Sequence, residues 1–249
     1  MKKQLLATLL ASTVVMTACG HDKETTNKTD HTNKVTNTTS LIKAAKAAAK
    51  NVNSYASTYK NNINDGSNQS VIDFGLMIDE QHNQKVTIKD NKESTVFYVY
   101  DKKTVLKQNN QWIDASTYVG SQMVSQTEPL LYNSQFKLID QLKGAKYEKN
   151  NGYTLTETFS DYKKYKALFG NTTENRKAIN ALEKKYPGIQ GSIIVMFNKD
   201  KQIEDITNKL TLKNDNTTVS NNAVTTFDKI NELKKLDIPD AVKQAESIQ

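Results

Sequence analysis

The stretch 71–79, Val71-Ile72-Asp73-Phe74-Gly75-Leu76-Met77-Ile78-Asp79, decides the fold class of this 249-residue chain. Its large apolar side chains recur at every second position, which places them on one face of a β-strand. They are Ile72, Phe74, Leu76 and Ile78. Strand patterns follow at 85–90, 95–100, 104–107 and 112–113, with polar turn residues between several of them. The sequence therefore predicts an antiparallel meander of four or five strands. The segment 95–100 is apolar on both faces, as expected of a strand that is covered on both sides or lines a cavity.

Helices and strands continue in separate blocks on either side of this meander. Helical patterns cover 41–52, 115–142 with an interruption before Pro129, 161–169 and 173–186. Further strands are expected over 153–159, 191–198, 202–213 and 217–227, and a short C-terminal segment, 238–242, is expected to dock on the body. This order predicts the α+β class, with one antiparallel sheet and helices collected on one face.

The N-terminal residues have the pattern of a secretory signal peptide. Two lysines precede an apolar run from Leu5 to Met16, and the small residues Thr17 and Ala18 follow. The run is too short to span a bilayer comfortably. The sequence therefore predicts a signal peptide over residues 1–18.

The only cysteine, Cys19, comes directly after this segment. The pattern resembles the lipobox of bacterial lipoproteins, although Met16 stands where that family usually has leucine. The resemblance implies that Cys19 carries a covalent diacylglycerol and holds the protein on the outer, extracytoplasmic face of the cell membrane. An ordinary secreted protein with an incidental free cysteine is the alternative. Residues 19–40 hold one branched apolar residue, Val35, which predicts a disordered tether. Residues 41–249 are then expected to form a single domain.

The element order behind a lipobox resembles the LolA/LppX-like fold, and in particular Gram-positive lipoproteins of unknown function. Two short C-terminal motifs carry the resemblance: Phe227-Asp228-Lys229-Ile230-Asn231 and Leu236-Asp237-Ile238-Pro239-Asp240-Ala241-Val242. The resemblance implies a curved half-barrel with helices packed on its concave face, and between them a cavity suited to acyl chains or another apolar ligand. Its candidate lining residues are Phe74, Leu76, Ile78, Phe97, Val99, Leu155, Val195 and Phe197. The alternative is that these side chains fill a solid hydrophobic core.

The motifs of common enzymes and metal sites are missing from the sequence. It contains no Gly-rich phosphate loop, no His-Glu-x-x-His, no Gly-x-Ser-x-Gly and no Cys/His metal spacing. Its three histidines are His21, His31 and His82, two in the expected tether and one in an expected turn. We therefore expect no enzyme activity, no metal site and no cofactor beyond the diacylglycerol on Cys19.

The 34 basic residues exceed the 27 acidic residues only moderately and are spread along the chain. Pairs of lysines have no aromatic residues interleaved as in nucleic-acid modules, so no nucleic-acid partner is expected.

Two functions from different classes fit these observations. The first is a lipid-anchored extracytoplasmic binding protein for a hydrophobic or lipid-like ligand, with the membrane as its partner through the anchor. The second is a surface module with a filled core that binds another protein, whose identity the sequence does not reveal.

Overall fold

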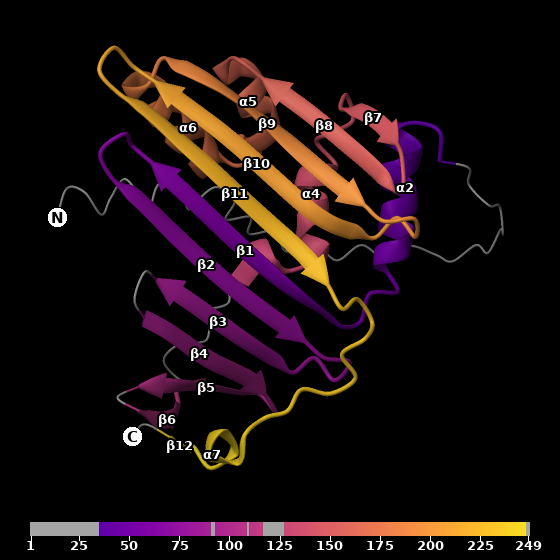
Figure 1. Cartoon of the computed structure of the whole chain (residues 1–249), viewed down its shortest axis with the longest axis vertical. Coiled ribbons are helices and arrows are strands. Elements are labelled where there is room, and N and C mark those ends of the chain that lie inside the picture. Colours follow the sequence, from indigo (N-terminus) through magenta and orange to yellow (C-terminus); the bar gives the residue numbers. More distant parts are fainter. Residues whose placement is uncertain (1–34, 91–92, 109, 117–126, 248–249) are drawn as a thin grey trace.

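One open sheet runs through the protein (Figure 1). The computed structural model describes residues 35–90, 93–108, 110–116 and 127–247. Within them the sheet has 12 strands in the order β12-β6-β5-β4-β3-β2-β1-β11-β10-β9-β8-β7. Neighbours are antiparallel except β12, which pairs in parallel with β6. The strands are β1 (Tyr55–Asn64), β2 (Gln69–Ile78), β3 (Gln84–Asp90), β4 (Glu93–Tyr100), β5 (Lys103–Gln108), β6 (Gln111–Asp114), β7 (Lys146–Lys149), β8 (Tyr153–Phe159), β9 (Gly188–Phe197), β10 (Ile203–Lys213), β11 (Thr218–Asp228) and β12 (Glu246–Ser247).

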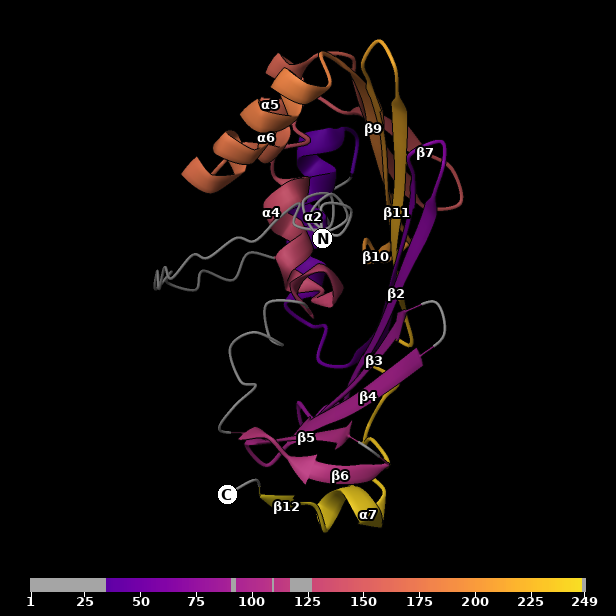
Figure 2. The same cartoon turned by 90° about the vertical axis from the view of Figure 1, so that its left-hand side faces the viewer.

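The sheet is curved, and most helices lie on its concave face (Figure 2). Those helices are α2 (Thr38–Ala49), the short 3-10 turns η1 (Glu128–Leu130) and η2 (Asn133–Gln135), α4 (Phe136–Ile139), α5 (Tyr162–Phe169) and α6 (Thr173–Lys185). A final helix, α7 (Asp240–Lys243), lies at the far end of the sheet beside β6. The predicted α+β class, a curved antiparallel half-barrel with helices on the concave face, is confirmed.

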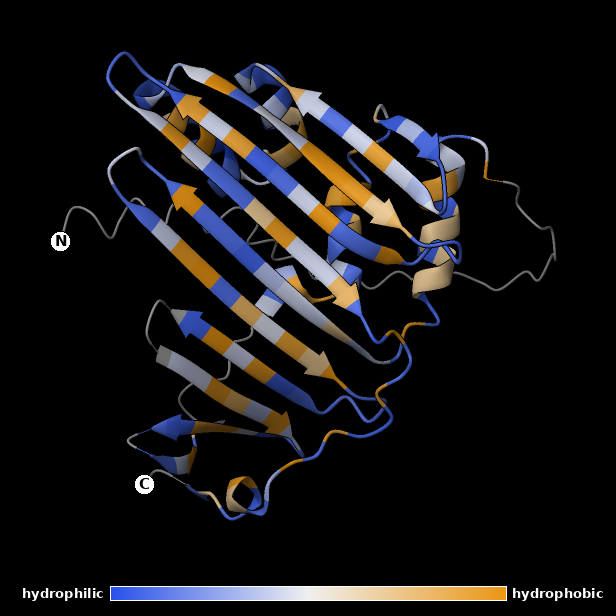
Figure 3. Ribbon diagram, viewed as in Figure 1, coloured by the Kyte–Doolittle hydropathy of each residue, from blue (hydrophilic) through white to orange (hydrophobic). Residues whose placement is uncertain are grey.

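Alternation along the strands builds the main core. In β2 the side chains of Leu76 and Ile78 are buried, and those of Ile72 and Phe74 are half-buried. Figure 3 shows apolar and polar residues alternating along the neighbouring strands. Burial follows this period of two in β11, where every second residue from Val219 to Phe227 is buried. The predicted meander is therefore confirmed, and its apolar face contributes to the main core on the helix side.

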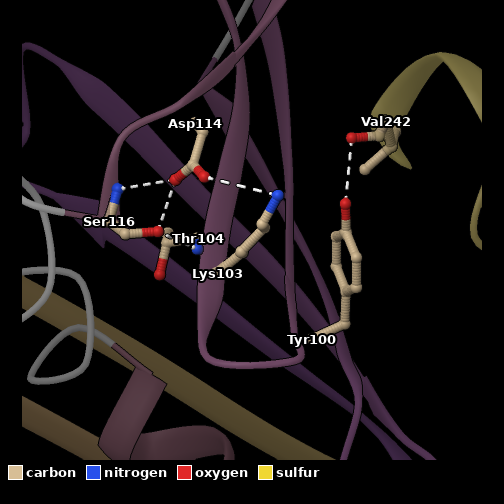
Figure 4. A network of polar contacts seen from close by, with 6 residues as sticks. All are labelled: Tyr100, Lys103, Thr104, Asp114, Ser116 and Val242. Atoms are coloured by element: carbon tan, nitrogen blue, oxygen red, sulfur yellow. Dashed lines mark hydrogen bonds and ion pairs between the residues drawn. The ribbon is translucent and has the colours of Figure 1, made fainter. Parts of the chain in front are cut away.

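A second, smaller core explains why 95–100 is apolar on both faces. Phe97 contributes to the main core, whereas Tyr98 and Tyr100 pack with Val105 and Val242. The Tyr100 hydroxyl donates a hydrogen bond to the Val242 carbonyl at 3.0 Å (Figure 4). The C-terminal segment thus covers the outer side of β4; the prediction that it docks on the body is confirmed, and the structure adds where it docks.

A buried carboxylate, that of Asp114, orders the end of β6. Asp114 accepts hydrogen bonds from the backbone N–H and the hydroxyl of Ser116, and Lys103 lies 3.9 Å away (Figure 4). The hydrogen bond from the Ser116 hydroxyl has the largest effect on the pKa of Asp114. It lowers this pKa from its ordinary value, although burial acts in the opposite direction. The Ser116 hydroxyl in turn accepts the Thr104 N–H at 2.8 Å, which ties β5 to the end of β6.

The structure differs from the sequence prediction in several helices and strands. The first helix begins at Thr38 because the Asn37 side chain caps it and the Ser40 hydroxyl accepts the Asn37 N–H, a capping box. It ends at Ala49 rather than at residue 52. The strands β1 and β7 were not predicted, because their segments are rich in Asn, Lys and Tyr and lack an apolar period. In the expected helix 115–142, residues 117–126 lie outside the described residues, and the rest forms η1, η2 and α4.

Asp79 joins the β2–β3 turn to the C-terminal segment. Its buried carboxylate accepts the backbone N–H groups of Gln81 and Asn83 at 2.9 Å each, and that of Leu236 at 2.8 Å. Burial raises the pKa of Asp79, but these hydrogen bonds together outweigh it, so the pKa is lowered from 3.8. The ionised carboxylate therefore stabilises the fold.

Replacing this carboxylate with an amide should weaken the fold in a pH-dependent way. Asp79→Asn is expected to lower the free energy of unfolding at pH 7 by about 3 kcal/mol, because the amide nitrogen cannot accept the N–H groups that face it. The native pKa lies below the unfolded one, so the carboxylate contributes above about pH 4 and loses its effect as the pH falls through the native pKa. Urea unfolding should show that the difference in free energy of unfolding between the native protein and Asp79→Asn is smaller at pH 3 than at pH 7. The exposed Asp200→Asn is the control. An equal difference at both pH values would contradict this account.

Candidate functional site

The segment 128–139 crosses the concave face and is tied to β1 by two hydrogen bonds. The Ser57 hydroxyl donates to the Leu130 carbonyl at 2.8 Å, and the Tyr132 N–H donates to the Tyr55 hydroxyl at 3.1 Å. All four residues are buried. Since this segment contributes five of the side chains around the site described below, these bonds set the position of one wall.

A third bond fastens the same segment to an irregularity in β10. The register of β10 against β9 shifts between Ile203 and Asp205, which disturbs the regular pairing there. The Tyr132 hydroxyl accepts the Ile203 N–H at 2.7 Å. Burial raises the pKa of Tyr132 to about 12, and this N–H bond lowers it less, so the phenol stays protonated at neutral pH. The ring also lies edge-on to Phe227, with 5.0 Å between ring centroids.

A cavity of about 80 Å³ lies between this segment, α5 and the middle strands of the sheet. Such a volume is enough for several water-sized groups. Its lining is Tyr59, Glu128, Pro129, Ser134, Gln135, Leu138, Phe169, Ile206, Asn208, Ala223 and Thr225. The walls are thus mixed, with apolar side chains from the helices and polar groups among the strand residues.

Three asparagines lie on the strands that form the floor of this cavity. Asn61 on β1 and Asn208 on β10 are both paired with Ala223 on β11, one from each side. Asn221 lies two residues before Ala223 and so shares its face of the sheet. Asn61 and Asn221 are 0% and 6% exposed. We call these three residues the asparagine floor; Asn208 itself lines the cavity, and Asn61 and Asn221 lie beside the lining residue Ala223.

Four polar atoms of the asparagine floor have no hydrogen-bond partner among the described residues. They are Oδ1 and Nδ2 of Asn61, Oδ1 of Asn208 and Oδ1 of Asn221. The nearby Tyr59 hydroxyl does not meet hydrogen-bond geometry with Asn61. Burial raises the pKa of Tyr59 to about 12, and the proximity of Asn61 lowers it less. The floor is therefore neutral and offers unmet hydrogen-bonding groups.

A row of aromatic rings supports the opposite wall. Phe169 lines the cavity, and its ring centroid is 4.8 Å from that of Tyr165, which is 5.2 Å from that of Phe159. Phe159 lies against Gly191, where any side chain would collide with that ring and with the Lys209 carbonyl. Because Gly191 has no side chain, the Phe159 ring can pack against it, and the row of rings can form.

The charges at the site are already paired. Glu128 accepts a hydrogen bond from the Lys137 ammonium at 2.8 Å. Within the described ranges, no group of three or more His, Cys, Asp or Glu side chains is placed to hold a metal ion. Nor does any helix of the described chain combine the length and apolar character needed to cross a bilayer. Amides, hydroxyls and apolar walls are suited to holding a ligand.

Larger hollows exist elsewhere, but they lack this chemistry. One of about 450 Å³ lies between α5 and the start of β9, and one of about 280 Å³ lies on the convex face near Gly75. Among the described residues, the buried side-chain atoms without partners all belong to the asparagine floor. The concave cavity is therefore the candidate site.

The eight predicted lining residues lie elsewhere on the concave side. Six are buried in the main core: Leu76, Ile78, Phe97, Leu155, Val195 and Phe197. Phe74 and Val99 are half-buried and pack against it. The 80 Å³ cavity is lined by other residues, and a ligand role for these eight stays a prediction. Cys19 lies outside the described residues.

The asparagine floor was not predicted, although a signal for it exists in the sequence. Asn61 stands two residues from both Tyr59 and Ile63, and Asn221 stands midway between Val219 and Ala223. A polar residue at an inward position of a strand is uncommon and marks a site to inspect. The signal at Asn61 could not be used, because β1 itself was not predicted.

Comparison with known proteins gives only distant similarity. No family model and no curated protein matches the sequence. LprF from Mycobacterium bovis has a TM-score of 0.40 and 10% identity, over 81% of this chain and 95% of that chain. A LolA superfamily protein from Nitrosomonas europaea has a TM-score of 0.27 and 7% identity, over 84% and 97%. A putative outer membrane lipoprotein-sorting protein domain from Vibrio parahaemolyticus has 0.26 and 10%, over 83% and 98%. These similarities are too low to transfer a ligand or an activity.

Removing the hydroxyl that supports the β10 irregularity should weaken the fold. Tyr132→Phe leaves the Ile203 N–H without its partner in a buried setting, which should cost about 2 kcal/mol. The melting temperature is expected to fall by roughly 4–8 °C, measured by circular dichroism. Tyr98→Phe is the matched control, because the Tyr98 hydroxyl has no hydrogen bond to another described residue. Equal melting temperatures for the two variants would show that the Tyr132 hydroxyl is dispensable.

Proposed function

We propose that the protein is a lipid-anchored extracytoplasmic binding protein that holds a hydrophobic or lipid-like ligand on the concave face of its sheet. The observation that carries this proposal is the cavity between the segment 128–139 and the middle strands. It combines apolar walls such as Leu138 and Phe169 with Asn208, whose Oδ1 has no hydrogen-bond partner among the described residues. Such a mixture is typical of sites that bind the apolar body of a ligand and orient it by a few polar contacts.

The anchor supports the same proposal from the sequence. A diacylglycerol on Cys19, joined to the folded domain by the residues that precede α2, would keep the domain on the outer face of the membrane, within reach of lipids and lipid-linked molecules. Binding without catalysis fits a cavity whose charged wall residue, Glu128, is paired with Lys137.

A second function, a surface module that binds another protein, is favoured by one observation. Six of the eight side chains that were candidates for a ligand cavity are packed in the core instead. On this view the 80 Å³ cavity holds only water, and the partner would bind the outer surface.

A bulkier side chain at the cavity floor should expel the ligand. In protein purified from membranes, native mass spectrometry should find a bound amphiphile, and Ala223→Leu is expected to lower the bound fraction at least about tenfold, a loss of ~1.4 kcal/mol in binding. Ala223 lines the cavity. Ala56→Leu is the matched control, because Ala56 faces the hollow on the convex side.

Two other results would count against the binding function. Native protein without any bound amphiphile, together with a specific protein captured by cross-linking in membranes, would favour the interaction module. Equal ligand retention by the Ala223→Leu and Ala56→Leu variants would place the ligand elsewhere.

The anchor can be tested separately. Cys19→Ala should abolish labelling by radioactive palmitate and leave the protein unprocessed or released from the membrane fraction, because the thiol that receives the lipid is gone. His21→Ala, two residues further on, is the control and should be labelled normally. Palmitate labelling of the Cys19→Ala variant at the native level would contradict the anchor.

A further inference from the structure

The asparagine floor is costly to the fold as it stands. Asn61 is fully buried and Asn221 is 6% exposed, yet both have polar atoms without partners among the described residues. A buried amide that makes no hydrogen bond is unfavourable, and an apolar side chain of similar shape at the same place is neutral or stabilising. Amides at these positions are therefore explained by something that binds them.

The register brings the three amides close together above one small side chain. Asn61 and Asn208 pair with Ala223 from opposite sides, so their backbones are two strand spacings apart, roughly 9.6 Å. Figure 1 shows β1, β11 and β10 side by side in the middle of the sheet. Ala223 leaves space between the flanking asparagines, and both Ala223 and Asn208 line the cavity. A group of a few atoms resting on Ala223 would contact Asn208 directly, and Asn61 lies buried on the other side of Ala223, one strand away.

We propose that the asparagine floor binds a neutral, hydroxyl-bearing head group of an amphiphilic ligand, such as the glycerol of a monoacylglycerol. This inference rests on the proposed ligand-binding function and names the polar part of the ligand. A hydroxyl both donates and accepts hydrogen bonds, so it satisfies either end of an amide. The six heavy atoms of glycerol also suit a cavity of about 80 Å³.

The charges at the site favour a neutral group over an ionic one. The carboxylate of Glu128 is paired with Lys137, and the floor itself consists of amides. An ionic head group placed there would lose its hydration without gaining an opposite charge. The acyl chain would then extend out of the cavity past its apolar wall residues Leu138, Phe169 and Ile206.

Two photoreactive probes can test this selectivity on the full chain in lipid vesicles. One is a monoacylglycerol and the other is the methyl ester of the same fatty acid, each with a diazirine in the acyl chain. The ester has no hydroxyl, so the native protein should be cross-linked at least tenfold more by the monoacylglycerol. The variants Asn61→Leu and Asn221→Leu should lose that preference and cross-link both probes to a similar, low extent.

A melting curve separates ligand binding from a structural role for the same amides. Without ligand, Asn61→Leu and Asn221→Leu should melt about 2 °C or more above the native protein, because each removes an unpaired buried amide. Asn62→Leu and Asn222→Leu are matched controls, since these residues are the outward neighbours on the same two strands. The controls should leave the cross-linking preference unchanged.

The possible results distinguish the proposed binding function from the head-group assignment. If the native protein cross-links both probes equally and strongly, the proposed binding function holds but the head-group assignment is wrong. If neither probe is cross-linked, both are wrong. If the inward leucine variants melt lower than the native protein while the controls do not, the amides support the fold and the head-group assignment is overturned.

Discussion

The hydrogen bond from the Ile203 N–H to the Tyr132 hydroxyl fixes where the helical side of the protein sits on the sheet. The register shift in β10 disturbs the pairing at Ile203, and a buried N–H without a partner would destabilise the fold. Tyr132 meets that need from a segment about 70 residues earlier in the sequence. The Tyr132 ring packs at an angle against Tyr55 and edge-on against Phe227, and the Tyr132 N–H donates to the Tyr55 hydroxyl. One wall of the cavity is thereby fixed relative to β1, β10 and β11, the strands that carry the asparagine floor.

The sequence predicted the fold wherever burial follows a simple period. The alternation in 71–79 predicted the antiparallel meander, and the apolar segment 95–100 was expected to be covered on both sides or to line a cavity. The meander is present, and β4 is covered on both sides. The same reasoning missed β1, because its segment Tyr55–Asn64 places Ser57 and Asn61 at inward positions. Ser57 anchors the segment 128–139, and Asn61 belongs to the asparagine floor. The polar residues that make β1 central to the candidate site are therefore the ones that prevented its prediction.

The candidate site was harder to predict than the fold for the same reason. The predicted lining residues were selected as large and apolar, and such side chains pack against one another and close the space between them. The cavity lies instead where small or polar residues interrupt that packing, at Ala223, Thr225 and Asn208. Which strands lie beside each other decides this arrangement, and the pairing of β1 with β11, residues far apart in the chain, is not visible in a sequence pattern.

The edges of the open sheet explain why its concave middle is the place left for a ligand. The edge strands β7 and β12 have only four and two residues, and β7 begins and ends with lysine. Short, charged edges disfavour pairing with another chain. The outer face of β4 is covered by the C-terminal segment, which Asp79 and Tyr100 hold through Leu236 and Val242. The outer face of β4 thus has its hydrogen bond and its apolar cover supplied by the chain itself. The asparagine floor lacks hydrogen-bond partners among the described residues, and a hydroxyl-bearing ligand would supply those missing hydrogen bonds.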